Sequence, residues 1–105
     1  MDNENKYNVE FSIISYAGNA RALADEAVTF AKDGDFESAQ KNVEEAQASL
    51  TEAHQAQTDL IFKAVNGEDV DISIFLIHAQ DHLTMATLAI DTANKFIDLY
   101  KEIKK

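Results

Sequence analysis

Two histidines, an aspartate and a glutamine fall within one five-residue segment of this sequence, His78-Ala79-Gln80-Asp81-His82. On a helix that advances about 100° per residue, His78 and His82 lie one turn apart on the same face. Asp81 lies about 60° to one side of His78, and Gln80 points nearly the opposite way. The surrounding residues are largely apolar, and burying ionisable groups among them is costly unless they are paired, protonated or bound to a metal. This segment is therefore the first candidate for a functional site.

Three interpretations of this segment compete. A purely structural role, in which His78 and His82 cap or cross-link a core, fits a lone histidine better than four polar side chains in five residues. A metallohydrolase is the second, because the form H-x-x-D-H is close to the H-x-x-E-H of inverted zinc proteases, although catalytic zinc also needs a third ligand and a cleft. Phosphoryl transfer is the third, because a neutral imidazole can attack a phosphoryl group and needs positioning rather than a large cavity.

Composition and charge limit the class of protein. A chain of 105 residues is expected to be one domain, 1–105, with a modest core. Its net charge of −10 argues against nucleic acid and anionic membrane surfaces as partners, because these require clustered lysine and arginine. The chain has no cysteine, no apolar run near the ~18 residues of a membrane span, and no basic start typical of a signal peptide. We expect a cytoplasmic protein without direct membrane insertion.

Two short polar interruptions divide the sequence into three long predicted helices, at about residues 8–32, 36–64 and 70–103. Proline is absent, and Gly34 and Gly67 fall in the two short polar interruptions of a chain rich in helix-forming residues. Gly34 suits a left-handed stop to the first helix, and Asp35 is a good N-cap for the second. Asp69 or Asp71 would cap the third. The polar residues before about Tyr7 are expected to be frayed.

The first two predicted helices carry apolar seams with alternating spacings of four and three, the pattern of helices that pack together. The first seam is Val9, Ile13, Tyr16, Ala20, Leu23, Ala27 and Phe30, flanked by Ala17, Ala24 and Ala31. The second is Ala39, Val43, Ala46, Leu50, Ala53, Gln57, Leu60 and Ala64. Close packing against a neighbour would explain Gly18 in the first helix. His54 and Gln57 are interpreted as satisfied polar groups near the bundle edge.

The third predicted helix is apolar around most of its circumference. One seam is Ile72, Leu76, Ala79, Leu83, Ala86, Ile90, Ala93, Ile97 and Tyr100, and a second is Phe75, His78, His82, Met85, Ala89, Phe96, Leu99 and Ile103. A further arc holds Ile74, Ile77, Asp81 and Leu88, and the strip expected to face solvent is Ser73, Gln80, Thr87, Asp91 and Asp98. A three-helix bundle needs one apolar face of roughly 100° or somewhat more on each helix. We therefore predict an all-α, antiparallel up-down-up bundle whose third helix also packs against another subunit.

Four separate stretches resemble one bacterial family. Ala17–Arg21 reads AGNAR, Ala31–Phe36 reads AKDGDF, Ala53–Ile61 reads AHQAQTDLI, and His78–Leu83 reads HAQDHL. Together they resemble the enzyme IIA component of the lactose/cellobiose type of the bacterial sugar phosphotransferase system, over roughly residues 13–100. Agreement in four separated stretches is far more specific than a five-residue motif alone.

The resemblance implies a homotrimer of three-helix protomers that relays phosphate. The chain would accept phosphate from the histidine-containing phosphocarrier protein and pass it to a cysteine of the IIB component during sugar uptake. The family's phosphoryl acceptor falls on His78, and its second histidine, which would stabilise the phosphate, falls on His82. Its metal-binding aspartate falls on Asp81, and Gln80 matches the motif in a supporting role. The alternative is a helical adaptor without chemistry, in which the histidines are structural.

Asp81 carries a further expectation about a metal ion. If three-fold symmetry brings three Asp81 carboxylates together, like charges about 4 Å apart repel by roughly 4 kcal/mol per pair at an effective dielectric of ~20. Either the carboxyls take up protons or a cation binds between them. Oxygen ligands with completing waters suit Mg²⁺ or another hard divalent ion better than zinc. We therefore expect a divalent metal, Mg²⁺ in the first place, at the trimer axis.

Overall fold

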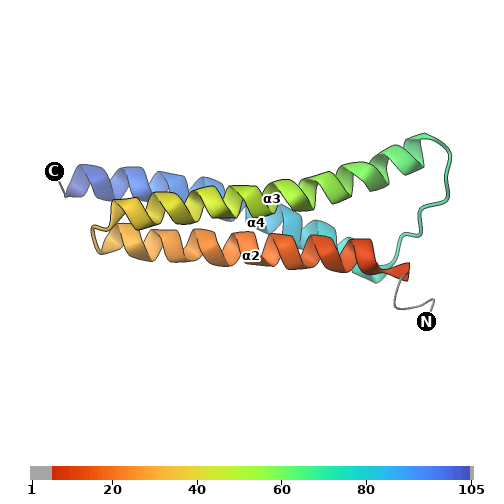
Figure 1. Cartoon of the computed structure of the whole chain (residues 1–105), viewed down its shortest axis with the longest axis horizontal. Coiled ribbons are helices and arrows are strands. Elements are labelled where there is room, and N and C mark those ends of the chain that lie inside the picture. Colours follow the sequence, from red (N-terminus) through yellow and green to blue (C-terminus); the bar gives the residue numbers. More distant parts are fainter. Residues whose placement is uncertain (1–5, 105) are drawn as a thin grey trace.

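The computed structural model describes residues 6–104, and three helices account for most of them (Figure 1). Helix α2 spans Asn8–Lys32, α3 spans Phe36–Val65 and α4 spans Ile74–Ile103. They run up, down and up in an elongated bundle of 55 × 27 × 18 Å, and the described residues contain no strand. None of the described helices combines the length and apolarity needed to cross a membrane. The predicted all-α, up-down-up bundle is confirmed, whereas the frayed start predicted before Tyr7 lies largely outside the described residues.

The turn between α2 and α3 has the form that its sequence predicts. Gly34 adopts a positive φ of 86°. The N–H groups of Gly34 and Asp35 donate to the carbonyls of Ala31 and Phe30 at 3.0 and 2.9 Å, which closes α2 in a Schellman motif. The Asp35 carboxylate then accepts a hydrogen bond from the backbone N–H of Ser38 at 3.1 Å and caps α3. Both predictions for this turn are confirmed.

We expect the Asp35 cap to make the stability of the bundle depend on pH in acid. Hydrogen bonds from the Ser38 side chain and backbone N–H lower the pKa of the Asp35 carboxyl below its ordinary value of 3.8. A carboxyl whose pKa is lower in the folded chain contributes stability above pH 3.8 and loses it as the pH falls through the lowered value. Asp35→Ala should therefore lower the Tm at neutral pH, and its difference from the parent should narrow in acid. Thermal melts at neutral pH and well below pH 3.8 check this, and a constant difference would contradict it.

Helix α4 begins at Ile74, later than the predicted start near residue 70. Its N-cap is Ser73, whose hydroxyl accepts a hydrogen bond from the backbone N–H of Leu76 at 3.1 Å. The prediction that Asp69 or Asp71 caps this helix is therefore wrong. Serine and aspartate are about equally good N-caps, so the choice depends on where the connection of residues 66–73 meets the bundle.

The core of the bundle is built mostly from alanine. Its buried hydrophobic residues are Ile13, Ala17, Ala20, Ala24, Ala27, Ala31, Ala39, Val43, Ala46, Leu50, Ala53, Ala79, Leu83, Ala86, Ile90, Ala93 and Ile97. The seams predicted for the second and third helices are thus confirmed over Ala39–Ala53 and Ala79–Ile97. Small side chains on facing positions allow the helix axes to approach closely.

In α2 the predicted seam is confirmed in part, because Ile13, Ala20 and Ala27 are completely buried, but the buried face extends to one side of that seam. The alanines predicted to flank that seam, Ala17, Ala24 and Ala31, are completely buried, whereas Val9 and Tyr16 are 38% and 41% exposed. The reason is that α2 packs along its length against both α3 and α4, so its buried face must fit two close neighbours. A Cβ added at Gly18 would meet no atom within 4 Å, so the predicted close packing there is not found within this chain.

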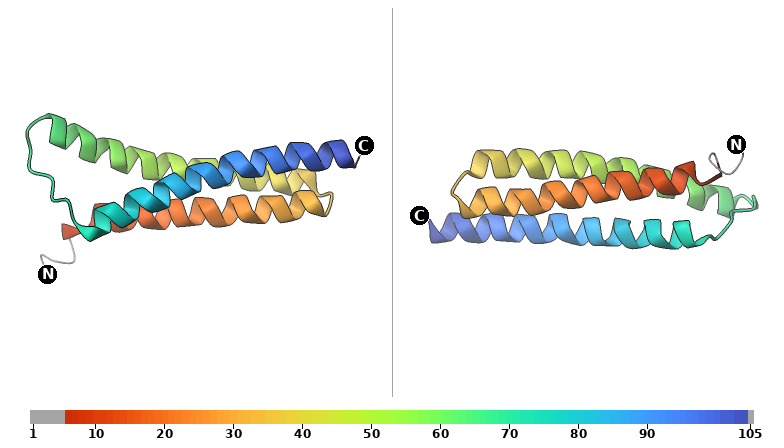
Figure 2. Two further views of the ribbon diagram at one scale, coloured as in Figure 1. Left: turned by 180° about the vertical axis from the view of Figure 1, so that it is seen from behind. Right: turned by 90° about the horizontal axis from the view of Figure 1, so that it is seen from below.

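Helices α3 and α4 diverge toward the connection of residues 66–73, as the view from behind shows (Figure 2, left). The predicted seam of α3 opens here, because Leu60 is only half-buried and Ala64 is exposed. Ile61 and Val65 are 50% and 75% exposed, and Ile72, predicted as the first member of an α4 seam, is 76% exposed. This end of the bundle therefore presents apolar side chains to solvent.

Candidate functional site

His78 and His82 lie together on α4, as their spacing predicts. Their Nε2 atoms are 3.0 Å apart, and their rings meet edge to face with centroids 4.5 Å apart and planes at 82°. In a hydrogen bond between two ring nitrogens, one carries the hydrogen and the other accepts it. His78 is exposed and His82 is half-buried. The first imidazole is therefore open to a reactant, and the second is partly covered by the protein.

An open groove borders His78. The histidine groove, as we call it, has a volume of about 490 Å³ and is lined by Ile74, Ile77, His78, Gln80, Asp81 and Thr84. It brings together three of the four site residues proposed from the sequence, and His82 reaches it through its contact with His78. Ile74 and Ile77 are 75% and 61% exposed, so part of the groove is apolar surface that nothing in this chain covers.

Gln80 does not lie on a fully solvated strip, as its spacing predicted, but is half-buried. The side-chain Nε2 of Gln57 on α3 donates a hydrogen bond to its Oε1. Its backbone carbonyl accepts a hydrogen bond from the Thr84 hydroxyl at 3.1 Å. The prediction that Gln57 is a satisfied polar group is confirmed, and His54 is exposed. The prediction for Gln80 was wrong because the spacing of residues within α4 does not report where the neighbouring helix α3 lies.

Asp81 is exposed on the same arc as Ile77 and Leu88, which are 61% and 56% exposed. Within residues 6–104, no three His, Asp or Glu side chains gather to hold a metal ion. A catalytic zinc needs three protein ligands, so the hydrolase interpretation lacks its third ligand in this part of the chain. Asp81 offers one exposed carboxylate, the ligand type that hard divalent ions prefer.

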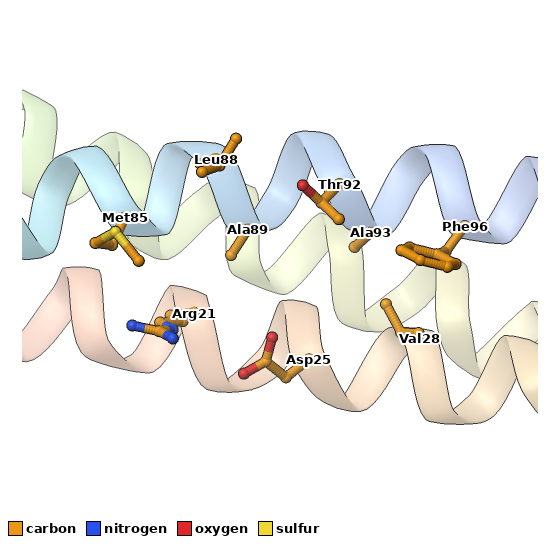
Figure 3. A pocket seen from close by; sticks show the side chains of 9 residues that line it. All are labelled: Arg21, Asp25, Val28, Met85, Leu88, Ala89, Thr92, Ala93 and Phe96. Atoms are coloured by element: carbon orange, nitrogen blue, oxygen red, sulfur yellow. The ribbon is translucent and has the colours of Figure 1, made fainter.

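A second groove lies between α2 and α4 (Figure 3). This α2–α4 groove has a volume of about 370 Å³ and is lined by Arg21, Asp25, Val28, Met85, Leu88, Ala89, Thr92, Ala93 and Phe96. Met85 follows His82 by about one helix turn, so the groove begins near the histidine pair. Arg21, the one arginine of the sequence, lies across from Met85 and brings to this groove a guanidinium group, which suits phosphate oxygens. The spacing of apolar residues does not single out Arg21. The sequence feature that could have indicated it is the AGNAR stretch, of which Arg21 is the last residue.

Fold and site together define a class of protein: a small helical bundle that offers an exposed, paired histidine at an open groove. The sequence model of the family described as the lactose/cellobiose-specific IIA subunit of the phosphotransferase system (PTS) matches residues 8–101. The chain therefore belongs to this IIA family of the sugar phosphotransferase system, as the resemblance of its four stretches predicted.

Named relatives are similar over nearly the whole chain. The lactose-specific EIIA component of Staphylococcus epidermidis is 45% identical over 92 residues, which cover 88% of each chain. The crystal structure of a cellobiose-specific enzyme IIA from Bacillus anthracis is 42% identical, with a TM-score of 0.91 over 94% of this chain and 91% of that one. A solution structure of the Escherichia coli chitobiose IIA in complex with HPr is 33% identical, with a TM-score of 0.80 over 95% of this chain and 97% of that one.

Proposed function

We propose that this chain is a phosphoryl carrier of a sugar phosphotransferase system. It acts in the cytoplasm, where it accepts a phosphoryl group on His78 from HPr, a histidine-containing phosphocarrier protein. It passes this group to a cysteine of a IIB component during sugar uptake. The observation that carries the proposal is the exposed His78 imidazole, whose Nε2 lies 3.0 Å from that of the half-buried His82. Membership of the IIA family, and the HPr complex of the chitobiose relative, support the relay and its donor.

The histidine pair can select the tautomer in which His78 acts as a nucleophile. When the shared hydrogen lies on Nε2 of His82, this N–H donates to Nε2 of His78. The neutral ring of His78 then carries its hydrogen on Nδ1 and has a lone pair on Nε2. The lone pair attacks the phosphorus of the donor phosphohistidine. A new N–P bond forms while the old one breaks, and the bonding electron pair returns to the donor imidazole. Each imidazole keeps the hydrogen on its other nitrogen, so the positive charge moves with the phosphoryl group.

His82 and Gln80 would act on the phosphoryl group once it has arrived. For the attack the hydrogen bond between the two imidazoles must break, which frees the Nε2 lone pair of His78 and leaves the N–H of His82 available to a phosphoryl oxygen. Gln80 lines the same groove and supports this role. In the onward step, a thiolate of the IIB component attacks the phosphorus, the N–P bond breaks, and its electron pair returns to His78. Positioning and charge stabilisation are what such a transfer requires.

Phosphorylation in vitro tests this function directly. The chain is incubated with phosphoenolpyruvate and the general proteins of the phosphotransferase system, and its intact mass is measured. We expect the mass to rise by one phosphoryl group, which should be labile in acid and should leave when a IIB component is added. If HPr becomes phosphorylated and this chain does not, the helical adaptor without chemistry is the correct interpretation.

We also propose that three copies assemble around α4. The arc of Ile74, Ile77 and Leu88 is between 56% and 75% exposed, and Leu99 and Ile103 extend exposed apolar surface to the end of the helix. Apolar surface of this extent on one element marks an interface. The family resemblance is the reason for three copies rather than two. In such a trimer the Asp81 carboxylates would meet, and with waters they would hold Mg²⁺ or another hard divalent ion that neutralises their charge.

A further inference from the structure

We infer that Phe75 is a positioning residue for phosphoryl transfer, because it fastens the first turn of α4, directly before His78, to the start of α2. The inference rests on the proposed function, since it concerns the histidine that would receive the phosphoryl group. The ring centroid of Phe75 lies 4.8 Å from that of Tyr7, the N-cap of α2, and 5.1 Å from that of Phe11. We call these three side chains the aromatic latch.

The first turn of α4 needs this latch because α3 diverges from α4 at this end of the bundle (Figure 2, left). Within the turn, Ile74 and Ile77 are 75% and 61% exposed, so they add little packing inside one chain. In the proposed trimer they would face other copies, which leaves the other two side chains to hold the turn to its own bundle. Of these, Leu76 is half-buried, and Phe75 is the one that contacts the rings at the start of α2.

The placement of this turn bears directly on the histidine pair. Side chains on a helix lean toward its N-terminus, so the His78 imidazole lies over the turn that carries residues 74 and 75. The Nε2 atoms of His78 and His82 are 3.0 Å apart because the backbone between them is helical and sets them on one face. If the first turn of α4 frays, the helical hydrogen bonds around His78 weaken, and its ring can leave His82.

The size of the effect follows from the contacts that would be lost. An aromatic pair is worth roughly a fivefold change in an equilibrium, and Phe75→Ala removes two pairs at once. Opening of the first turn should therefore become roughly 25-fold more favourable. Helix ends open easily, and an end that is open about a tenth of the time would then be open for most of it. The competent fraction, and with it the rate of transfer, should fall roughly threefold.

Phe75→Ala tests the latch. The rate of transfer from phosphorylated HPr at saturating concentration should fall roughly threefold, and hydrogen exchange of the His78 backbone amide should accelerate roughly 25-fold. Phe75→Tyr keeps the ring and should restore the parent values. Phe36→Ala is the matched control, because it truncates a half-buried ring at the opposite end of the bundle, where Lys101 Nζ lies 5.8 Å from the ring centroid. It should lower the Tm but leave transfer and His78 exchange unchanged.

Two further measurements separate positioning from stability and from docking. In NMR spectra, the ring nitrogen signals of His78 should move in Phe75→Ala toward those of the exposed His54, whereas Phe36→Ala should leave them in place. Phe11→Ala, which removes one pair from the α2 side, should accelerate His78 exchange roughly fivefold in the parent and not at all in a Phe75→Ala background.

The outcomes separate this inference from the proposed function. If Phe75→Ala transfers at the parent rate at saturation, the latch does not position His78, although phosphorylation of His78 stands. A variant that needs only more HPr to reach the parent rate would show that Phe75 is a docking contact, which also overturns the inference. Should Phe75→Ala fail to fold, Phe75→Leu, which keeps apolar bulk but not the ring pairs, decides by the same measurements. A parent chain that takes up no phosphoryl group overturns the proposed function, and this inference with it.

Discussion

Replacing His78 by alanine is expected to abolish phosphorylation of this chain by HPr while its helical content stays intact. His78 would be the attacking group, and its loss leaves no imidazole at that position of the groove. Because the side chain is exposed, its truncation removes little packing from the core, so the Tm should change little. Intact mass after incubation with phosphoenolpyruvate and the general phosphotransferase proteins measures the label, and circular dichroism measures the fold.

The other two histidines of the chain are matched controls. His54 is exposed on α3, and His54→Ala should be phosphorylated like the parent. His82→Ala removes the donor that would bind a phosphoryl oxygen, so transfer should slow roughly tenfold while the label still maps to His78. A label that persists on the His78→Ala protein, or that maps to His54, would show that the acceptor is assigned wrongly.

Removal of divalent metal is expected to lower the Tm of the assembled protein at neutral pH, and Asp81→Leu is expected to remove this sensitivity. Without an ion, three carboxylates meeting at a three-fold axis would repel by roughly 4 kcal/mol per pair at about 4 Å separation. In mild acid, protons shared among the carboxyls can replace the metal, so a chelator should have less effect there. Leucine at position 81 removes the charges, and packed apolar groups often stabilise a site that held buried charges.

Melting curves of the parent and of Asp81→Leu, with and without chelator at neutral and mildly acidic pH, test this. Light scattering gives the assembly, expected at about three times the chain mass of 11.7 kDa for both proteins. Asp98→Leu makes the same change on the solvent-facing strip of α4 and should keep the chelator sensitivity of the parent. If Asp81→Leu dissociates to monomers while the parent ignores the chelator throughout, Asp81 is not an axial metal ligand.

Much of the fold follows from short-range chemistry that the sequence states directly. Gly34 and Asp35 close one helix and start the next because a left-handed glycine and a capping carboxylate act within a few residues. The meeting of His78 and His82 is local in the same sense, because residues four apart on any helix share a face. The sequence alone therefore determined the three-helix plan and the histidine pair.

Contacts between residues far apart in the chain could not be predicted from the sequence and became known only from the tertiary structure. The buried face of α2 extends to its flanking alanines because two neighbouring helices pack against it, and periodicity within one helix does not report how many neighbours it has. Ser73 rather than Asp71 caps α4 because the connection meets the bundle there. The hydrogen bond between Gln57 and Gln80 joins residues on different helices, so only the placement of α3 beside α4 decided which way the Gln80 amide faces.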